Sequence, residues 1–435
     1  MPSADCHDLN RSHKRQIGFL IYRDFRALTK PVTLEPYSLF GRLLSSQAAD
    51  PRNFDTTLSL VKGALTPIMT GADLASVLAA YKSELERYLH LSDSAQSVLS
   101  FELTDRTRQH IRETAQLHVC DEHLLPLQKM GAGTRSLAIL AILTLIMRRR
   151  GRGILALEEP ETFLVPHAQR RVVDECLDLA DQTFITTHSP YVLERIPAGG
   201  VGRLERQAGG LLNWRPLDIA NVKHLNLYAK RIRQSFCEAL LGKGVVIVEG
   251  DSDRWWIDGA SRVMNRRVWK GRRQEALELQ GICVISADTN SDIAKLGRFF
   301  HDAGVQVVCL ADRVKDAAVV NELCGAPFSA LFLRYRGLEE LLTSELDTEL
   351  MRECLTNALH SRGLRPSADD VASASEDSLK QIFYEFLTHN KGSAQFHEWL
   401  ISCLDENRLP RSLKDLIDLI AELVSQPMCC KLSLL

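Results

Sequence analysis

The sequence contains no G-x-x-x-x-G-K-[ST] segment, the glycine-rich loop whose backbone amides and lysine bind nucleotide phosphates in many ATPases. The segment GAGTRS at residues 131–136 is glycine-rich, but it carries no lysine and is followed by Leu137. The chain therefore has no recognisable cradle for a β-phosphate. We expect weak or undetectable ATP binding by this chain alone.

The sequence also lacks the patterns of metal-binding cysteines, membrane spans and secretory signals. Its eleven cysteines form no C-x-x-C pair, which argues against a zinc site or a disulfide scaffold. No apolar run approaches the ~18 residues of a membrane span, and residues 1–15 are polar, unlike a secretory signal. Reduced thiols in the cytoplasm fit this composition best, and no membrane partner is expected.

Charge of one sign is not in excess either. The 53 basic and 55 acidic residues give a net charge of −2, so any contact with nucleic acid must be local. What the chain does have is length and apolar content. Its 435 residues, 45% of them hydrophobic, are enough for two or three domains with sizeable cores.

One α/β pattern lies between residues 130 and 190. It predicts an apolar helix over residues 134–150, a buried strand over 154–157, a second helix ending near 179 and a strand over 183–187. In parallel sheets, chemistry occurs at the carboxyl ends of the strands. The polar residues at these two ends are Glu158, Glu159 and His188.

A second α/β pattern begins in the middle of the chain. A buried strand is predicted over residues 245–248, followed by Glu249, a glycine turn and Asp253 early in the next helix. Further along, another predicted strand ends on Asp312. Carboxylates at adjacent strand ends converge, and Mg²⁺ and Mn²⁺ prefer oxygen ligands. Glu249, Asp253 and Asp312 are therefore candidate metal ligands.

The motifs of the first pattern resemble those of one branch of ATPases. GAGTRS resembles the signature motif of ABC-type ATPases, ILALEEPE their Walker B strand, and TTHSP the histidine switch of the SMC, Rad50 and RecF branch. The resemblance implies that Glu159 activates water, that His188 contacts the γ-phosphate, and that Ser136 contacts nucleotide across a dimer. The nucleotide-binding residues that it implies are Gly131, Gly133, Ser136, Glu158, Glu159 and His188.

The motifs of the second pattern resemble a Toprim domain, the metal-binding nuclease fold. VEGDSD resembles its glutamate motif, and LADRV resembles its second motif, normally D-x-D, only in the first aspartate. Together with the EEPE form of the Walker B strand, this pattern resembles the OLD (overcoming lysogenization defect) nucleases. Val314 stands where the second aspartate is expected, and Asp316, two residues further, is the candidate substitute.

Two further positions follow from the resemblance to OLD nucleases. RYRGLEELL resembles an acidic motif in which Glu339 would bind a second ion, and the alternative is an ordinary glutamate in the first turn of a helix. HNKGSAQFHEWL resembles a helical segment with a lysine matching Lys391, which would stabilise the transition state, and the alternative is a solvated surface lysine. By contrast, we interpret Asp251 and Ser252 as helix-cap or turn residues.

The predicted fold is α/β: a partial ABC-type ATPase lobe, then a Toprim domain, then a C-terminal helical extension. The predicted segments are a helical arm with partial ATPase segment over residues 1–130, the rest of the ATPase portion over 131–240, the Toprim domain over 241–345 and the helical extension over 346–435. The chain resembles the C-terminal part of an ATPase lobe. Three explanations for the missing phosphate-binding loop stay open: a wrong gene start, a truncation, or a real loss of the phosphate-binding half.

The resemblance implies an endonuclease that cleaves or nicks DNA with Mg²⁺ or Mn²⁺, is regulated by ATP in the intact family and forms a homodimer. It places such proteins in phage defence or DNA repair. Two alternatives stay open: a catalytically impaired DNA-binding or regulatory remnant, and an ATPase switch with an inactive Toprim domain. A partner subunit that supplies the phosphate-binding loop is also open. The implied catalytic residues are Glu249, Asp312, Lys391 and Glu159, and the implied metal ligands are Glu249, Asp253, Asp312, Asp316 and Glu339.

Overall fold

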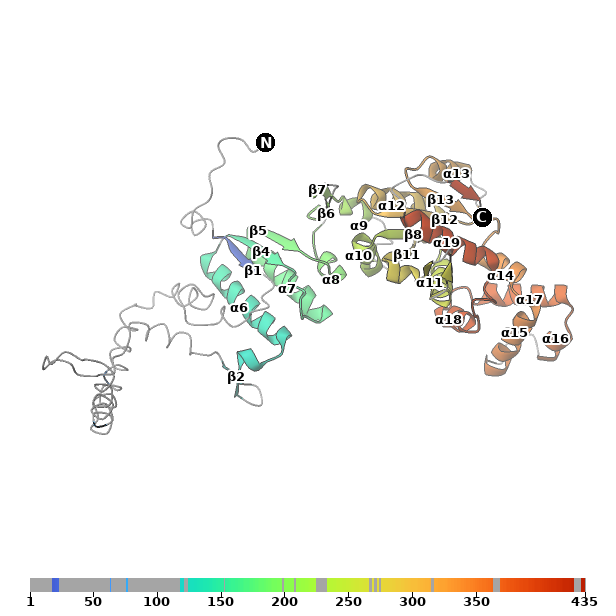
Figure 1. Ribbon diagram of the computed structural model, residues 1–435, viewed down its shortest axis with the longest axis horizontal. Coiled ribbons are helices and arrows are strands. Elements are labelled where there is room, and N and C mark those ends of the chain that lie inside the picture. Colours follow the sequence, from blue (N-terminus) through green and yellow to red (C-terminus); the bar gives the residue numbers. More distant parts are fainter. Residues whose placement is uncertain are drawn as a thin grey trace, which may run out of the picture. The chain divides into compact units, whose positions relative to one another are not determined.

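Figure 1 shows the computed structural model of the chain, which divides into two compact units, residues 1–187 and residues 188–435. The predicted helical arm before residue 118 lies almost wholly outside the described residues, as do Val314 and Asp316. The predicted division into four segments stays a prediction. The structure describes residues 18–22, 63, 76, 118–120, 124–151, 153–197, 199–206, 209–223, 233–265, 268–269, 272–273, 275–313, 317–362, 368–425 and 432–434.

The first unit is built on a parallel three-stranded sheet. The central strand β4 (Ile154–Glu158) lies between β1 (Leu20–Tyr22) and β5 (Gln182–Thr186). Helix α6 (Ala132–Arg150) precedes β4, and α7 (Pro166–Leu179) connects β4 to β5. The apolar faces of these elements form one buried cluster. The helices and strands predicted from the sequence in this region are confirmed to within two residues.

The ends of these helices follow from local chemistry. Gly131 caps α6, and Gly151 ends it in the left-handed conformation with a φ of 75°, which glycine adopts without steric cost. Pro166 opens α7 at the position where a missing N–H costs nothing. Before α6, the chain forms an antiparallel pair and a 3-10 turn. These are β2 (His118–Cys120), β3 (Leu124–Pro126) and η2 (Leu127–Lys129).

The second unit contains a five-stranded parallel sheet in the order β11-β8-β12-β13-β14. All five residues of β8 (Gly244–Val248) are buried, as expected for a parallel strand covered on both faces. Alternate residues of β8 belong to two separate hydrophobic clusters, one on each face of the sheet. The other strands are β11 (Ile282–Ser286), β12 (Gln306–Ala311), β13 (Ser329–Phe332) and β14 (Leu432–Leu434).

The helices of the second unit divide between the two faces of the sheet. One cluster contains residues of α10 and α12, and the other contains residues of α11 and of the helices that follow β13. The helices that accompany the strands are α10 (Arg233–Leu241), α11 (Asp251–Val263), α12 (Asn290–Asp302) and α13 (Ala317–Cys324).

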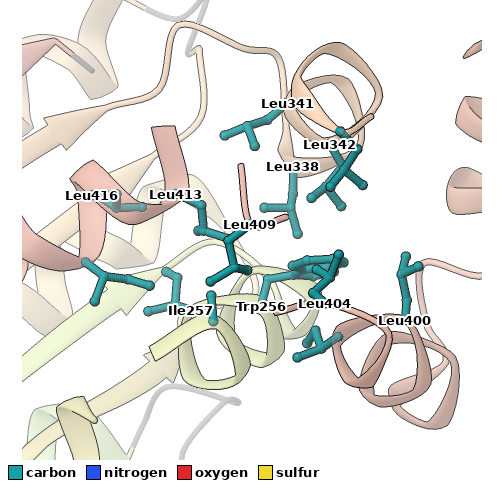
Figure 2. Close-up of a cluster of buried hydrophobic side chains, with 14 of the residues drawn as sticks. Trp256, Ile257, Leu338, Leu341, Leu342, Leu400, Leu404, Leu409, Leu413 and Leu416 are labelled. Carbon is teal, nitrogen blue, oxygen red and sulfur yellow. The ribbon is translucent and has the colours of Figure 1, made fainter. Parts of the chain in front are cut away.

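The C-terminal helices share their core with the sheet. Figure 2 shows Trp256 and Ile257 of α11 facing leucines of α14, α18 and α19, and all these side chains belong to one buried cluster. The helices of the predicted extension are therefore packed on the sheet through a common core. The helices after β13 are α14 (Leu338–Glu345), which precedes the predicted extension, and α15 (Thr348–Arg362), α16 (Ala368–Ser373), α17 (Glu376–His389), α18 (Ala394–Ser402) and α19 (Arg411–Ser425).

Smaller elements open the second unit and flank the sheet. The glycine-rich segment after residue 198 forms a hairpin, in which β6 (Gly202–Arg206) pairs with β7 (Leu212–Pro216). The remaining elements are α8 (Pro190–Leu193), α9 (Ile219–Lys223), β9 (Val268–Trp269), β10 (Arg272–Arg273) and η4 (Leu277–Gln280).

Two segments depart from what their sequence suggests. Residues 367–378 are polar, as in a linker, but this stretch contains α16 and the first turn of α17, whose cap Ser375 accepts from the Ser378 N–H. The chain end carries no pattern that predicts a strand, but it contains β14, which pairs with β13. In the part of the chain that the structure describes, no helix has both the length and the apolarity to cross a membrane.

Candidate metal centre

The candidate centre lies at the carboxyl end of the five-stranded sheet. Glu249 directly follows β8, and Gly250 caps α11, whose first turn carries Asp253. The Gly250 N–H donates to Asp253 Oδ2 at 3.0 Å. This tight turn brings Glu249 and Asp253 to the same end of the strand, in the arrangement that their spacing of four residues predicted.

The helix-cap contact of α11 comes from Asp253, so Asp251 and Ser252 do not cap the helix; they lie in its first turn. Asp251 accepts a hydrogen bond from Ser286 Oγ at 2.6 Å and so ties α11 to the end of β11. Ser252 is buried. Asp253 therefore has a structural contact through one carboxylate oxygen in addition to its predicted place in the cluster.

Asp312 follows β12, the strand next to β8, and lies within the influence of the other acids. Burial is the largest cause of its raised pKa, about 8, and the charges of Asp253 and Glu249 raise this pKa further. Lys391 lowers the pKa of Asp312, and Glu339 raises it. The cluster therefore disfavours full ionisation, because like charges repel where water is partly excluded.

The same groups act on Asp253. Burial raises the pKa of Asp253 to about 6, against the opposing effects of the Gly250 hydrogen bond and of Lys391. The charges of Glu339 and Glu249 raise this pKa again. These reciprocal effects mark one electrostatic cluster of four carboxylates and one ammonium group.

Glu339 joins the cluster beside a glycine. A β-carbon placed on Gly337 would lie 3.0 Å from Glu339 Oε2 and 3.4 Å from Asp312 Oδ2, so both carboxylates lie against the face that glycine leaves open. The neighbouring Glu340 is engaged elsewhere, since its Oε2 accepts from the Arg336 N–H at 2.6 Å. The structure thus separates two adjacent acids of α14 into one inside the cluster and one outside it.

Lys391 reaches the cluster from the turn between α17 and α18. Its Nζ lies 3.1 Å from Glu339 Oε1. Burial lowers the pKa of Lys391, but the charges of Glu339, Asp253 and Asp312 outweigh it, and the net pKa is raised. Lys391 is therefore a cation at neutral pH. The ion pair is defined by distance alone, because the buried Oε1 makes no hydrogen bond of good geometry within the described residues.

The chemical type of the residues present suits a hard divalent ion. Four carboxylates offer oxygen donors, which Mg²⁺ and Mn²⁺ prefer, and the buried Glu339 Oε1 has acceptor capacity that no hydrogen bond fills among the described residues. As placed, however, no three acidic, histidine or cysteine side chains of the described residues are close enough together to hold an ion. An ion would have to draw the carboxylates towards one another.

Three arginines that the sequence analysis missed lie close in the chain to two acids of the cluster, Asp312 and Glu339. Arg313 directly follows Asp312, and its N–H donates to Tyr335 O at 3.1 Å, which joins its loop to the loop with Arg334 and Arg336. All three arginines are exposed. The only signal in the sequence is their position beside the acidic motifs. Exposed arginines on two joined loops suit a polyanionic ligand.

In the first unit, the GAGTRS segment lies against the turn that follows β4. A β-carbon on Gly133 would lie 2.7 Å from the carbonyl oxygen of Phe163, so glycine allows this close approach. Gly131 is exposed at the start of α6, whereas Ser136 is only 2% exposed. The contact of Ser136 with nucleotide therefore stays a prediction that needs the helix start to rearrange.

The strand-end residues of the first unit are partly strained. Glu158 ends β4 with an exposed side chain, and Glu159 has a φ of 44°, a left-handed conformation that costs energy for a residue with a β-carbon. The Glu159 N–H donates to Thr186 O at 3.0 Å. His188 is the first residue of the second unit. The catalytic role of Glu159 and the sensing role of His188 stay predictions.

Comparisons with known proteins agree with both sets of motifs. A family model described as an AAA ATPase domain matches residues 68–193. A second, described as the Toprim domain of proteins like the overcoming lysogenization defect protein, matches residues 240–313. No curated protein matches the chain. The expected resemblance to OLD proteins and the α/β architecture are thus confirmed.

Solved structures with partial similarity include the C-terminal regions of two OLD proteins. The Burkholderia pseudomallei region is 16% identical, with 42% of this chain and 98% of that chain covered and a TM-score of 0.31. The Xanthomonas campestris pv. campestris region is 20% identical, with 42% and 96% covered and a TM-score of 0.29. Stu0660 of Streptococcus thermophilus is 11% identical, with 53% and 67% covered and a TM-score of 0.30.

Proposed function

Because the chain joins an AAA ATPase domain to an OLD-like Toprim domain, we propose that it is a divalent-metal-dependent endonuclease of the OLD type, which nicks or cleaves DNA. The observation that carries the proposal is the convergence of four carboxylates and one lysine. They come from the ends of β8 and β12, the first turns of α11 and α14, and the turn between α17 and α18. Partly buried like charges with raised pKa values are typical of functional sites.

The chain's own residues would bind the ion and balance its charge. Two divalent ions ~4 Å apart stabilise the attacking and leaving oxygens in phosphodiester cleavage. Asp253 and Asp312 must first lose their protons, which is hardest for Asp312, because its pKa is about 8 whereas that of Asp253 is about 6. Lys391, a cation beside Glu339, would face the scissile phosphate and stabilise its negative charge. The residues that would hold Mg²⁺ or Mn²⁺ are Glu249, Asp253, Asp312 and Glu339.

DNA is the proposed substrate because three exposed arginines lie close in the chain to two acids of the cluster. The chain as a whole has a net charge of −2 and exerts no general attraction on nucleic acid. The exposed Arg313, Arg334 and Arg336 lie on two joined loops beside Asp312 and Glu339. Phosphate contacts from such arginines would position the backbone without reading its sequence.

ATP regulation and dimerisation are proposed on the AAA ATPase match alone. In this proposal Glu159 activates water, His188 contacts the γ-phosphate, and the GAGTRS segment contacts nucleotide across a homodimer. The printed sequence offers no lysine-bearing phosphate loop, so nucleotide binding needs a further segment or a partner subunit. A role in phage defence or DNA repair follows from the same resemblance.

A catalytically impaired DNA-binding remnant is the second candidate. It is favoured by Val314 in place of an aspartate and by the spread of the acidic side chains, no three of which form a closed ligand set among the described residues. In this case the arginines would still bind DNA, and no cleavage would follow. The third candidate is an ATPase switch with an inactive Toprim domain. It would show neither DNA nicking nor ATP turnover in this chain.

The test is nicking of supercoiled plasmid across Mg²⁺ and Mn²⁺ series, with EDTA as the blank. Glu339→Gln and Glu340→Gln form a matched pair, since the two acids are neighbours on α14 but only Glu339 faces the cluster. We expect Glu339→Gln to lose nicking by roughly 10- to 100-fold and Glu340→Gln to retain it. DNA binding without metal-dependent nicking in the natural chain would favour the remnant instead.

A further inference from the structure

His397 is a buried histidine with both ring nitrogens engaged. It is 2% exposed and lies in the first half of α18. The Trp256 indole N–H donates to His397 Nδ1 at 3.0 Å, and His397 Nε2 lies 3.0 Å from Lys391 O. An indole nitrogen can only donate, so Nδ1 must be the acceptor. Nε2 therefore carries the proton and donates it to the Lys391 carbonyl oxygen.

This assignment describes a neutral ring with one fixed tautomer. Burial lowers the pKa of His397, although the Lys391 carbonyl and the charge of Glu339 act in the opposite direction. A neutral imidazole that accepts at one nitrogen and donates at the other satisfies both neighbours. A doubly protonated ring would set two N–H groups against each other at Nδ1.

The histidine holds the turn that presents Lys391. The Lys391 side chain is 57% exposed and is paired at its tip with Glu339, so the reach of its ammonium depends on where its backbone lies. Within the turn, the Asn390 side chain donates to Phe386 O at 2.8 Å and the Ser393 N–H donates to Asn390 O at 2.9 Å. The Lys391 backbone is held from both sides: its N–H donates to Thr388 O of α17 at 3.4 Å, and its carbonyl oxygen accepts from His397 of α18.

The other end of the network is anchored beside a metal-ligand candidate. Trp256 lies three residues after Asp253 on α11, which is about one helical turn. It is fully buried in the cluster shown in Figure 2, among leucines of α14 and the α18–α19 region. Trp256 therefore cannot move without disturbing the core. The packing holds its N–H in place, and this donor orients the His397 ring.

We propose that His397 is a positioning residue: held by Trp256, it fixes the backbone of Lys391 and so sets the reach of the Lys391 ammonium to Glu339 and the scissile phosphate. The effect of His397 on nicking rests on the proposed nuclease function. The fixing of the Lys391 backbone by His397 does not. It connects the helix that carries Asp253 to the turn that carries Lys391. Two groups of the centre are thereby held in register through a neutral imidazole.

The catalytic test is a double-mutant cycle with Lys391. His397→Leu removes both hydrogen bonds at similar volume, and we expect kcat for plasmid nicking to fall on the order of 10- to 100-fold, as for a misplaced catalytic group, with KM changed less than about twofold. His397→Leu should cause no further loss in a Lys391→Ala background, because coupled residues are not additive. His397→Gln, whose amide can accept and donate, should restore part of the activity.

The matched control is His389→Leu, which alters an exposed histidine in the last turn of α17, two residues before Lys391. It should leave kcat unchanged. Natural kcat in His397→Leu would overturn the proposal. So would an equal further loss on top of Lys391→Ala, because a general structural defect adds to any background.

A second measurement does not depend on nicking. Amide hydrogen exchange of residues 390–393 should be faster in His397→Leu and in Trp256→Phe than in the natural chain, while α17 and β8 keep their protection. Unchanged exchange in the turn would overturn the proposal even in an active enzyme. If the natural chain does not nick DNA under any condition, the nuclease proposal fails, and the exchange result still decides the positioning role.

Discussion

Both units place acids at the carboxyl ends of parallel strands, but their surroundings differ. In the first unit, Glu158 ends β4 and Glu159 follows it, and the neighbouring strand β5 leaves Phe184 54% exposed. In the second, Glu249 follows the fully buried β8, and acids and a lysine from four other segments gather near it. An acid at a strand end therefore indicates chemistry chiefly where distant parts of the chain meet it.

The largest effect should come from removing a carboxylate of the second unit. Glu249→Gln and Asp312→Asn should each lower metal-dependent nicking by more than the ~10- to 100-fold that outer-shell metal partners contribute. Glu159→Gln, the equivalent change in the first unit, should leave nicking without ATP unchanged. The measurement is the initial rate of plasmid nicking at saturating Mn²⁺. Equal losses in all three variants would abolish the contrast between the units.

A gain of activity should follow from completing the acidic motif. Val314→Asp should raise nicking by about tenfold and extend it from Mn²⁺ to Mg²⁺, because Mg²⁺ demands near-ideal octahedral oxygen geometry. Asp316→Ala should lower the natural activity if Asp316 substitutes for the missing ligand. These positions lie outside the described residues, so the expectation comes from the sequence. A mutant with unchanged nicking and metal binding would mean that LADRV is wrongly aligned.

A moderate effect should appear in thermal unfolding with metal and pH. The pKa of Asp312 is about 8 in the folded chain against an ordinary 3.8, so without metal the folded state keeps a proton that the unfolded chain has released. Stability then falls as pH rises through this window. Mn²⁺ should therefore raise Tm more at pH 8 than at pH 6, since binding requires deprotonation.

The stabilisation by Mn²⁺ at 100 times Kd is about 2.7 kcal/mol. EDTA should reverse it. In Asp312→Asn, both the metal effect and its pH dependence should shrink. A Tm that responds to Mn²⁺ equally at both pH values, in the natural chain and in the variant, would contradict the assignment of Asp312 to the centre.

The smallest effect is expected for nucleotide. Titration calorimetry with ATP and Mg²⁺ should detect no sub-micromolar binding by this chain, because the sequence offers no lysine and loop for the β-phosphate. Glu159→Gln should not change this result. If a subunit with the missing loop is added, the same variant should retain bound ATP. Tight binding by the chain alone would show that the first unit completes a nucleotide site in another way.

Local patterns allowed much of the fold to be predicted. The apolar runs 154–157 and 245–248 predicted buried strands, and polar residues after them predicted the sheet edge where Glu249 and Asp312 lie. The parallel-strand rule was sufficient to bring these two acids together. What no local pattern contains is the contact of side chains that are distant in the chain.

His397 and β14 illustrate that limit. His397 meets Trp256 across 141 residues, and this depends on how α18 packs against α11. β14 has three residues, too few for a periodic signal, and forms because β13 offers a partner. That Asp253 and not Asp251 makes the cap contact of α11 has a different reason, since the choice between acids two residues apart depends on turn geometry.

The pairing of β13 with β14 has a consequence for the motions available to the helices between them. These helices, α14 to α19, leave the sheet at one strand and return to it at the neighbouring strand, so they form a very long crossover attached at both ends. A segment attached at one end can rotate about a hinge as a rigid body. A segment attached at two adjacent points is limited to small internal displacements and twisting. Opening the centre for a DNA strand would therefore have to come from small displacements within this crossover, and not from rotation of the helical extension as a rigid body.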